Sequence, residues 1–144
     1  MLVLLYACMQ VYAYIYEVEI MRETLKAFKV LTDETRFRIL NLLLERECCV
    51  CEIEQALEIS QSKASRGLTA LYDAGFLQQR KDGLWSLYSM DKAINTDYRG
   101  QLVAAVQESG RQNPQMAADR ERLQQAIRTS PRCSGANTPC AVGN

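Results

Sequence analysis

A change in hydrophobic period after Gly75 is the sequence feature that most restricts how this chain can fold. Before that glycine, apolar residues recur at helical spacing, whereas residues 76–80 and 84–90 are two short extended runs around Asp82-Gly83. Asp-Gly between two such runs is a strong signal for a β-hairpin. The sequence therefore predicts a mainly α fold (α+β) that contains one two-stranded hairpin.

Helical spacing and capping residues divide the rest of the chain. Thr32 or Asp33 caps one predicted helix, Ser60 caps another, and Gly75 ends the latter as a C-terminal glycine should. Residues 45–48 form a break between helices, and the turn at residues 58–60 joins two short helices directly before the hairpin. The predicted helices cover about residues 21–31, 33–44, 49–57, 61–74, 94–108 and 115–128.

The first twenty residues differ in character from the rest of the chain. Residues 2–16 are apolar and aromatic, but they are shorter than the roughly 20 residues that span a bilayer, and they lack the basic start and cleavage site of a signal peptide. We expect residues 1–20 to be an extension outside the core and Met21 to be the natural initiator. The alternative is an additional N-terminal helix or strand on a dimer surface. The expected organisation is then a domain at residues 21–110 and a helix with a tail at residues 111–144.

The composition excludes several kinds of site. The 144 residues include 17 basic and 17 acidic residues, six cysteines and no histidine. Without histidine there can be no Ser-His-Asp triad, Cys-His dyad or His-containing zinc site. We therefore expect no enzyme activity and no catalytic cofactor. Because residues 2–16 are too short to span a bilayer, we also expect no membrane partner.

The cysteines are unevenly placed. Three are crowded at Cys48, Cys49 and Cys51, two lie near the end at Cys133 and Cys140, and Cys8 stands alone. A secreted mini-protein would spread its disulfides through a shorter chain. The pattern indicates reactive or metal-binding thiols in a reducing compartment, the cytoplasm.

Two short helices followed at once by a hairpin are the parts of a winged helix-turn-helix. A helix that lies in the major groove of DNA exposes small or hydrogen-bonding side chains near its N-terminus. The hairpin adds basic residues at its tip, where they could reach a phosphate. The predicted DNA-binding residues are Gln61, Ser62, Lys63, Ser65, Arg66, Arg80 and Lys81.

Several motifs in fixed order resemble the ArsR/SmtB family of bacterial metal-sensing repressors. They are residues 31–40 (LTDETRFRIL), 47–53 (ECCVCEI), 60–68 (SQSKASRGL), 73–77 (DAGFL) and 82–88 (DGLWSLY). The resemblance implies a homodimer that binds operator double-stranded DNA and leaves it when an inducer binds. It also implies that residues 21–31 and 94–108 form the dimer interface.

Cys49-Val50-Cys51 resembles the arsenite-binding motif of the arsenic-responsive branch, so As(III) or Sb(III) is the implied inducer. These metalloids are soft and prefer three thiolates. In a regular helix Cys49 and Cys51 would point about 200° apart, so joint binding requires a distorted helix start. The third cysteine of the motif is replaced by Glu54. Cys48, which lies three residues before Cys51, and the tail residues Cys133 and Cys140 are the candidate third ligands. Alternatively, as the resemblance allows, Cys133 and Cys140 form an inducer site of their own, independent of Cys49 and Cys51.

Other functions could use the same sulfurs. Within the repressor class, the protein could sense Cd(II), Pb(II) or thiol oxidation. A cysteine-based metal buffer is the alternative outside that class, but it would not need the polar helix start and the basic hairpin.

Overall fold

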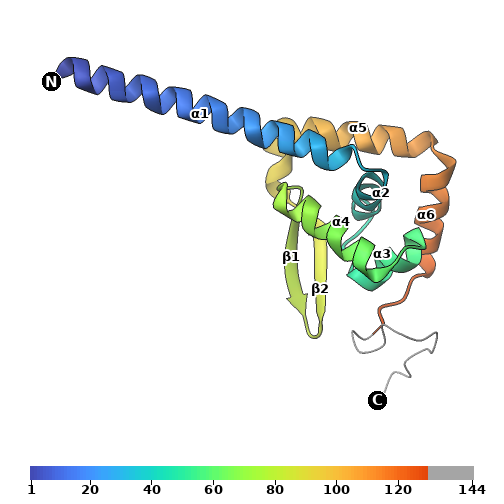
Figure 1. The fold of residues 1–144 in the computed structure, drawn as a ribbon. Helices are drawn as coiled ribbons and strands as arrows, with labels where there is room; N and C mark the ends of the chain where they lie inside the picture. Colours follow the sequence, from blue (N-terminus) through green and yellow to red (C-terminus); the bar gives the residue numbers. More distant parts are fainter. Residues whose placement is uncertain (130–144) are drawn as a thin grey trace.

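A computed structural model describes residues 1–129 of the chain. Six α-helices, one short 3-10 helix and one hairpin make up this part (Figure 1). In chain order the elements are α1 (Leu2–Leu31), α2 (Glu34–Leu43), α3 (Val50–Leu57), α4 (Gln61–Asp73), β1 (Leu77–Asp82), β2 (Trp85–Met90), η1 (Lys92–Thr96), α5 (Tyr98–Gln112) and α6 (Pro114–Gln125).

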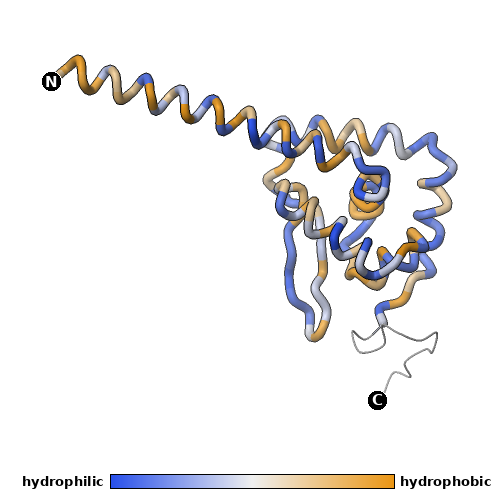
Figure 2. Tube along the Cα trace, in the orientation of Figure 1, coloured by the Kyte–Doolittle hydropathy of each residue, from blue (hydrophilic) through white to orange (hydrophobic). Residues whose placement is uncertain are grey.

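Helix α1 is continuous through Met21, so the structure has the additional N-terminal helix that was the alternative expectation. It contains no glycine or proline that would interrupt it. Its first half projects away from the other elements (Figure 1), and many exposed residues in that half are hydrophobic (Figure 2). Only Ala27 and Val30 of α1 are buried. No helix among the described residues is both long and apolar enough to span a membrane.

The core lies where α2, α3, α4 and the start of β1 meet. Asp33 caps α2 by accepting a hydrogen bond from the Arg36 backbone N–H at 2.9 Å. The apolar stripe predicted for this helix supplies much of the core, with Ile39, Leu40 and Leu42 fully buried. This stripe is the surface on which the other helices are assembled.

A sharp turn joins α3 to α4. Glu58 ends α3 in the left-handed conformation, at φ 54°, and the Ser60 hydroxyl accepts from the Lys63 N–H at 3.2 Å to start α4. Helix α4 lies very close to α2 at Gly67, where an added Cβ would meet the Ile39 Cδ1 atom at 2.5 Å. The absence of a side chain at Gly67 permits this close packing.

The hairpin follows directly. Strands β1 and β2 are antiparallel, with Leu77 opposite Met90 and Asp82 opposite Trp85, so Gly83 and Leu84 form the turn. An isolated bridge pairs Cys48 with Tyr88 and attaches the segment before α3 to the hairpin. A helix-turn-helix followed by a two-stranded wing is a winged helix-turn-helix, so the predicted fold class is confirmed.

The C-terminal helices differ from the prediction at their ends. A 3-10 turn occupies residues 92–96, so α5 begins at Tyr98 and not at Ile94. Asp97 caps α5 by accepting from the Arg99 N–H at 2.8 Å, and this fixes the later start. Helix α6 ends at Gln125, three residues before the predicted end.

Buried charges attach α6 to the core. The Asp119 carboxylate, 1% exposed, accepts two hydrogen bonds from Arg38 of α2, at 2.7 and 2.8 Å, and one from Arg122 at 2.6 Å. Arg122 also donates to the Ala56 carbonyl of α3 at 2.7 Å. Pairing with Asp119 raises the pKa of Arg38. These contacts hold α6 against both α2 and α3.

Replacing Asp119 with alanine should lower the free energy of unfolding by roughly 2–4 kcal/mol. Removing one partner of a buried ion pair typically costs about 3–5 kcal/mol, and this loss is smaller because Arg38 and Arg122 keep some contact with solvent. Urea unfolding at equal protein concentration measures the change. Glu121→Ala, at an exposed position of the same helix, is the control. A loss no larger than that of the control would contradict this role of Asp119.

Candidate thiol site and nucleic-acid interface

Cys49 lies one residue before α3 and not within it. Its backbone is extended, at φ −86° and ψ 172°, and the helix begins at Val50. The Glu52 carboxylate accepts a hydrogen bond from the Cys49 N–H at 2.8 Å, which is half of a capping box. The Cys-x-x-Glu spacing therefore sets the helix start between the two cysteines of the motif.

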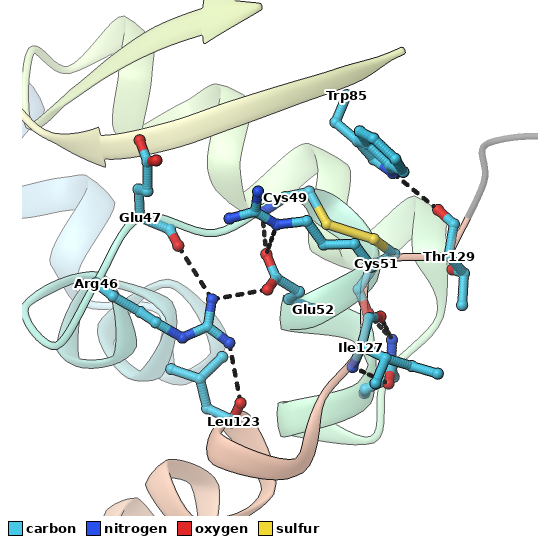
Figure 3. Close-up of a disulfide and its surroundings, with 11 residues drawn as sticks. Arg46, Glu47, Cys49, Cys51, Glu52, Trp85, Leu123, Ile127 and Thr129 are labelled. Atoms are coloured by element: carbon cyan, nitrogen blue, oxygen red, sulfur yellow. Dashed lines mark hydrogen bonds and ion pairs between the residues drawn. A yellow bond between two sulfur atoms is a disulfide. The ribbon is translucent and has the colours of Figure 1, made fainter. Parts of the chain in front are cut away.

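This helix start brings Cys49 and Cys51 together. Their Cα atoms are 5.5 Å apart and their sulfurs form a disulfide (Figure 3). That separation is ordinary for a disulfide. The sequence predicts free thiols at Cys49 and Cys51, whereas the structure joins them in a disulfide. The two sulfurs converge because the extended backbone at Cys49 replaces the helical geometry that would have pointed them apart.

Cys48 has a different environment from its neighbours. Its side chain is 0% exposed, and its thiol donates to the Arg46 carbonyl at 3.4 Å. Burial raises the pKa of the Cys48 thiol to about 12. The expectation that Cys48 shares a helix face with Cys51 is wrong, because α3 starts only at Val50 and Cys48 pairs with Tyr88 of the wing.

A buried carboxylate organises the surroundings of the pair. Glu52 is 3% exposed and also binds Arg46, at 2.7 Å, and Arg128, at 3.3 Å (Figure 3). Arg46 in turn donates to the Leu123 carbonyl of α6 at 3.0 Å. Glu52 therefore connects the start of α3 to the C-terminal part of the described chain. Sequence analysis missed this role, although its position three residues after Cys49 is a capping signal.

The strap, defined as residues 126–129, runs from α6 past the thiol pair. Gln55 exchanges two hydrogen bonds with the backbone of Ile127, at 2.7 and 3.1 Å, and it donates to the Cys51 carbonyl at 2.9 Å. The Trp85 indole N–H of the wing donates to the Thr129 carbonyl at 3.0 Å. The strap thus contacts both α3 and the wing (Figure 3).

The described residues do not assemble a complete three-ligand site. Within residues 1–129, no cluster of three or more histidine, cysteine, aspartate or glutamate side chains could hold a metal ion. Cys8 is exposed on α1. The candidate ligands Cys133 and Cys140 lie outside the described residues.

The predicted DNA-binding residues of α4 lie together at the start of the helix. Gln61, Ser62, Lys63 and Arg66 are exposed, and Ser65 is half-buried. Ala64 and Leu68 on the opposite face are fully buried in the core. The apolar face therefore anchors α4, and the polar face remains open to solvent.

The predicted wing residues are not at the tip, which consists of Gly83 and Leu84. Arg80 pairs with Glu47, which lies just before the thiol pair, and its Nε donates to Oε2 at 3.0 Å. The Arg80 guanidinium lowers the pKa of Glu47. Lys81 donates across the hairpin to the Ser86 hydroxyl at 2.7 Å. Both basic side chains are exposed, yet both contact other residues of the chain.

Comparison with known proteins agrees with this arrangement. Residues 33–79 match the model of the family described as bacterial regulatory protein, arsR family. An arsenical resistance operon repressor of Bacillus subtilis is 35% identical over 79 residues, which are 54% of this chain and 75% of that protein. The chain belongs to the arsR family.

Two other relatives extend the comparison. An arsenic resistance transcriptional regulator of Pseudomonas putida is 47% identical over 78 residues, 51% of this chain and 61% of that protein. A homolog of the cadmium resistance regulatory protein CadC from Staphylococcus aureus is 42% identical over 67 residues, 46% of this chain and 55% of that protein. The chain thus spans about three fifths of the length of these two relatives.

Among solved structures, a homodimeric winged helix-turn-helix DNA-binding domain from Mycobacterium bovis has a TM-score of 0.57 and 24% identity. The matched region covers 68% of this chain and 87% of that domain. Reduced HlyU from Vibrio cholerae has a TM-score of 0.53 and 25% identity, and it covers 67% of this chain and 94% of that protein. The likeness to the Mycobacterium bovis domain agrees with the winged helix fold.

In the folded, reduced protein, Cys48 should resist alkylation by iodoacetamide at pH 8, whereas Cys8 should react. The raised pKa keeps the Cys48 thiol protonated at pH 8. The buried, neutral thiol contributes fully to the stability of the fold below pH 9.0, the ordinary pKa of a cysteine. That contribution is lost only as the pH rises toward about 12, so a change from pH 7 to 9 should not expose the thiol. Peptide mass spectrometry measures labelling, and protein unfolded in urea is the control. Equal labelling of Cys48 and Cys8 in the folded protein would refute this assignment.

Proposed function

We propose that this protein is a homodimeric, DNA-binding transcriptional repressor that leaves its operator when As(III) or Sb(III) binds Cys49 and Cys51. The observation that carries the proposal is the convergence of these two sulfurs at the start of α3, the helix that packs directly against α4. An inducer can release DNA only if it binds better to the released form than to the bound form. The proposed inducer would act by reshaping the start of α3.

The exposed start of α4 supports DNA binding. Its side chains are of the kinds that read base edges and phosphates in the major groove: Gln61, Ser62, Lys63, Ser65 and Arg66. Among the described residues of α4, neither Lys63 nor Arg66 forms an ion pair within the chain. Both charges are therefore available to a phosphate or a base.

Exposed apolar side chains on α1 support the dimer. Leu25 and Phe28 are 57% and 53% exposed, whereas Ala27 of the same helix turn is buried. A second copy that covered them would remove this apolar surface from water. The homodimeric domain from Mycobacterium bovis supports the same assembly by likeness of fold.

The thiol pair also suits the chemistry of the proposed inducer. Trivalent arsenic and antimony bind soft thiolates and need no imidazole. The arsenic resistance regulators that resemble this chain support these metalloids as inducers. Cys48 is not part of the proposed site, because its thiol is buried and bonded to the Arg46 carbonyl.

Two contacts provide a route from the thiol pair to the wing. Cys48 exchanges backbone hydrogen bonds with Tyr88, at 3.0 and 2.8 Å, and Glu47 pairs with Arg80. A displacement of the segment before α3 would therefore move the wing or release Arg80. Both sensor and DNA-contacting residues would respond to the same local change.

Thiol oxidation is a second candidate signal for the same repressor. The disulfide between Cys49 and Cys51 favours it, because the folded chain accommodates the oxidised pair. Arsenite needs the two thiols reduced, so the two signals compete for the same sulfurs. Cd(II) and Pb(II) are further alternatives, and the similarity to the cadmium resistance homolog favours the former.

Replacing Lys63 or Arg66 with alanine should weaken binding to a palindromic duplex from the protein's own upstream DNA by roughly tenfold or more. Each side chain is expected to contact a phosphate or base, and good contacts contribute about 1–3 kcal/mol. Fluorescence anisotropy at several salt concentrations measures affinity and its salt dependence. Lys92→Ala is the control, because Lys92 is exposed on η1 away from the proposed interface. Variants that bind like this control would contradict the assigned face.

Arsenite should dissociate the complex of the reduced protein with its duplex. The protein is first reduced with a phosphine, which is removed before the titration. No added thiol is then present to bind the arsenite. The double variant Cys49→Ser/Cys51→Ser should bind DNA but not respond, and Cys8→Ser should respond normally. Release by an oxidant or Cd(II) but not by arsenite would support an alternative signal, and a response by the double variant would refute the site.

A further inference from the structure

We propose that a cavity between α2, α5 and α6 binds a small oxyanion, a carboxylate or a phosphate, through Asn41, Arg111 and Arg120. These three helices pack against one another where α5 turns into α6 (Figure 1). None of the residues that line the cavity belongs to the thiol pair or to the predicted DNA-binding residues. The inference therefore goes beyond the proposed function and does not depend on it.

The cavity has the size and lining of a site for a charged ligand. Its volume is about 330 Å³, which is at the lower end of the range for small-molecule sites. Five of its six lining side chains are polar. The six are Asn41, Leu44, Glu45, Gln107, Arg111 and Arg120. A lining of this kind suits a hydrophilic ligand and not an apolar one.

Asn41 carries a hydrogen-bond donor that the described chain does not use. The residue is only 4% exposed, and its Oδ1 atom accepts from Arg120 at 3.0 Å. Because a guanidinium can only donate, this contact fixes Oδ1 toward Arg120 and leaves Nδ2 as a separate donor. Within residues 1–129, Nδ2 donates to no acceptor, yet no side-chain nitrogen sealed from solvent there lacks a partner. The Nδ2 group therefore opens into the cavity that Asn41 lines.

Arg120 brings a positive charge that no carboxylate of the described chain neutralises. One of its terminal nitrogens, Nη1, donates to Asn41 and to the Gly110 carbonyl at 3.1 Å, and both acceptors are neutral. No ion pair within residues 1–129 includes Arg120. Its Nε and Nη2 groups have no partner in this part of the chain. These two groups form the edge of a guanidinium that binds carboxylates and phosphates in a bidentate manner.

A second arginine lies at the same cavity. Arg111 pairs with Glu108 at 2.9 Å, but both side chains are well exposed, so the pair contributes little and can be exchanged for a ligand. Helix α5 comes very close to Asn41 here, because a Cβ added at Gly110 would lie 2.0 Å from Nδ2. The glycine therefore allows the residue next to Arg111 to contact the buried amide.

The charges of the lining favour an anion. Two arginines face one carboxylate, that of Glu45, which is exposed and forms no ion pair with either arginine within residues 1–129. Glu45 opposes an anionic ligand, although water screens its charge. The three donor groups and the single opposing acid predict effects of opposite sign when each is replaced.

Titration of the ¹⁵N-labelled full-length protein with sodium phosphate, and separately with sodium malonate, tests the site by NMR. Sodium chloride is varied to hold the ionic strength constant. Saturable shifts are expected for the Asn41 side-chain amide and the Gly110 N–H, and the anion that binds more tightly identifies the ligand as a phosphate or a carboxylate. Saturable shifts only at the start of α4 would place phosphate at the DNA-binding face. That result, or no saturation with either anion, would overturn the proposal.

Asn41→Asp is the sharpest variant. It keeps an oxygen that accepts from Arg120, but it replaces the free donor with a negative charge. Affinity for the anion should fall at least roughly tenfold, because a charge-assisted hydrogen bond is lost and a repulsion is gained. Asn95→Asp, at an exposed position of η1, is the matched control and should bind like the wild type. A folded Asn41→Asp protein that binds as tightly as this control would refute the site.

Two exposed positions keep the test decisive even if Asn41→Asp does not fold. Arg111→Gln should weaken binding about three- to tenfold, whereas Glu45→Gln should strengthen it about twofold or more. Arg22→Gln, at an exposed position of α1, is the control for loss of a positive charge. Unchanged affinity in both Arg111→Gln and Glu45→Gln would overturn the proposal.

Discussion

The buried carboxylate of Glu52 is the group on which the thiol site depends. It accepts a hydrogen bond from the Cys49 N–H, so that α3 begins after Cys49, at Val50, and it also binds Arg46 and Arg128. A buried charge is tolerated only when it is paired and hydrogen-bonded. Glu52 meets this requirement with partners from both sides of α3. The same interactions that satisfy the charge therefore set the geometry of the two sulfurs and attach the strap.

Helix α3 is held along its length by the C-terminal part of the described chain. Glu52 binds the strap near the start of α3, Gln55 binds it in the middle, and the Ala56 carbonyl binds Arg122 of α6 near the end. The strap also reaches Trp85, while Cys48 bridges to Tyr88. In the proposed function, a change at the thiol pair would therefore reach the wing through backbone on both sides of α3 as well as through the packing of α3 on α4.

The fold was largely predictable from the sequence, because its signals are local. The cap at Ser60, Gly75 after α4 and Asp82-Gly83 in the hairpin each determine a short segment, and the structure agrees with them. The predicted start of α5 at Ile94 differs from the structure, whereas the expectation that Met21 is the natural initiator stays a prediction. The ion pairs of Asp119 and Glu52 join residues far apart in sequence, so no local spacing predicted them. The placement of Cys48 was missed for the same reason, since it depends on a bridge to β2.

The distinction between the two candidate signals lies in the third ligand. A disulfide joins Cys49 to Cys51 and uses both sulfurs, so oxidation requires nothing from the strap. In the proposed function, trivalent arsenic would bind the same two sulfurs, and its third bond would require a further donor. Both signals constrain the same extended backbone before α3, and both would therefore move the same neighbours, Glu47 and Cys48. In the proposed function, selectivity for a trivalent metalloid over an oxidant would then depend on groups outside the pair, and Gln55 and Trp85 hold the strap beside it.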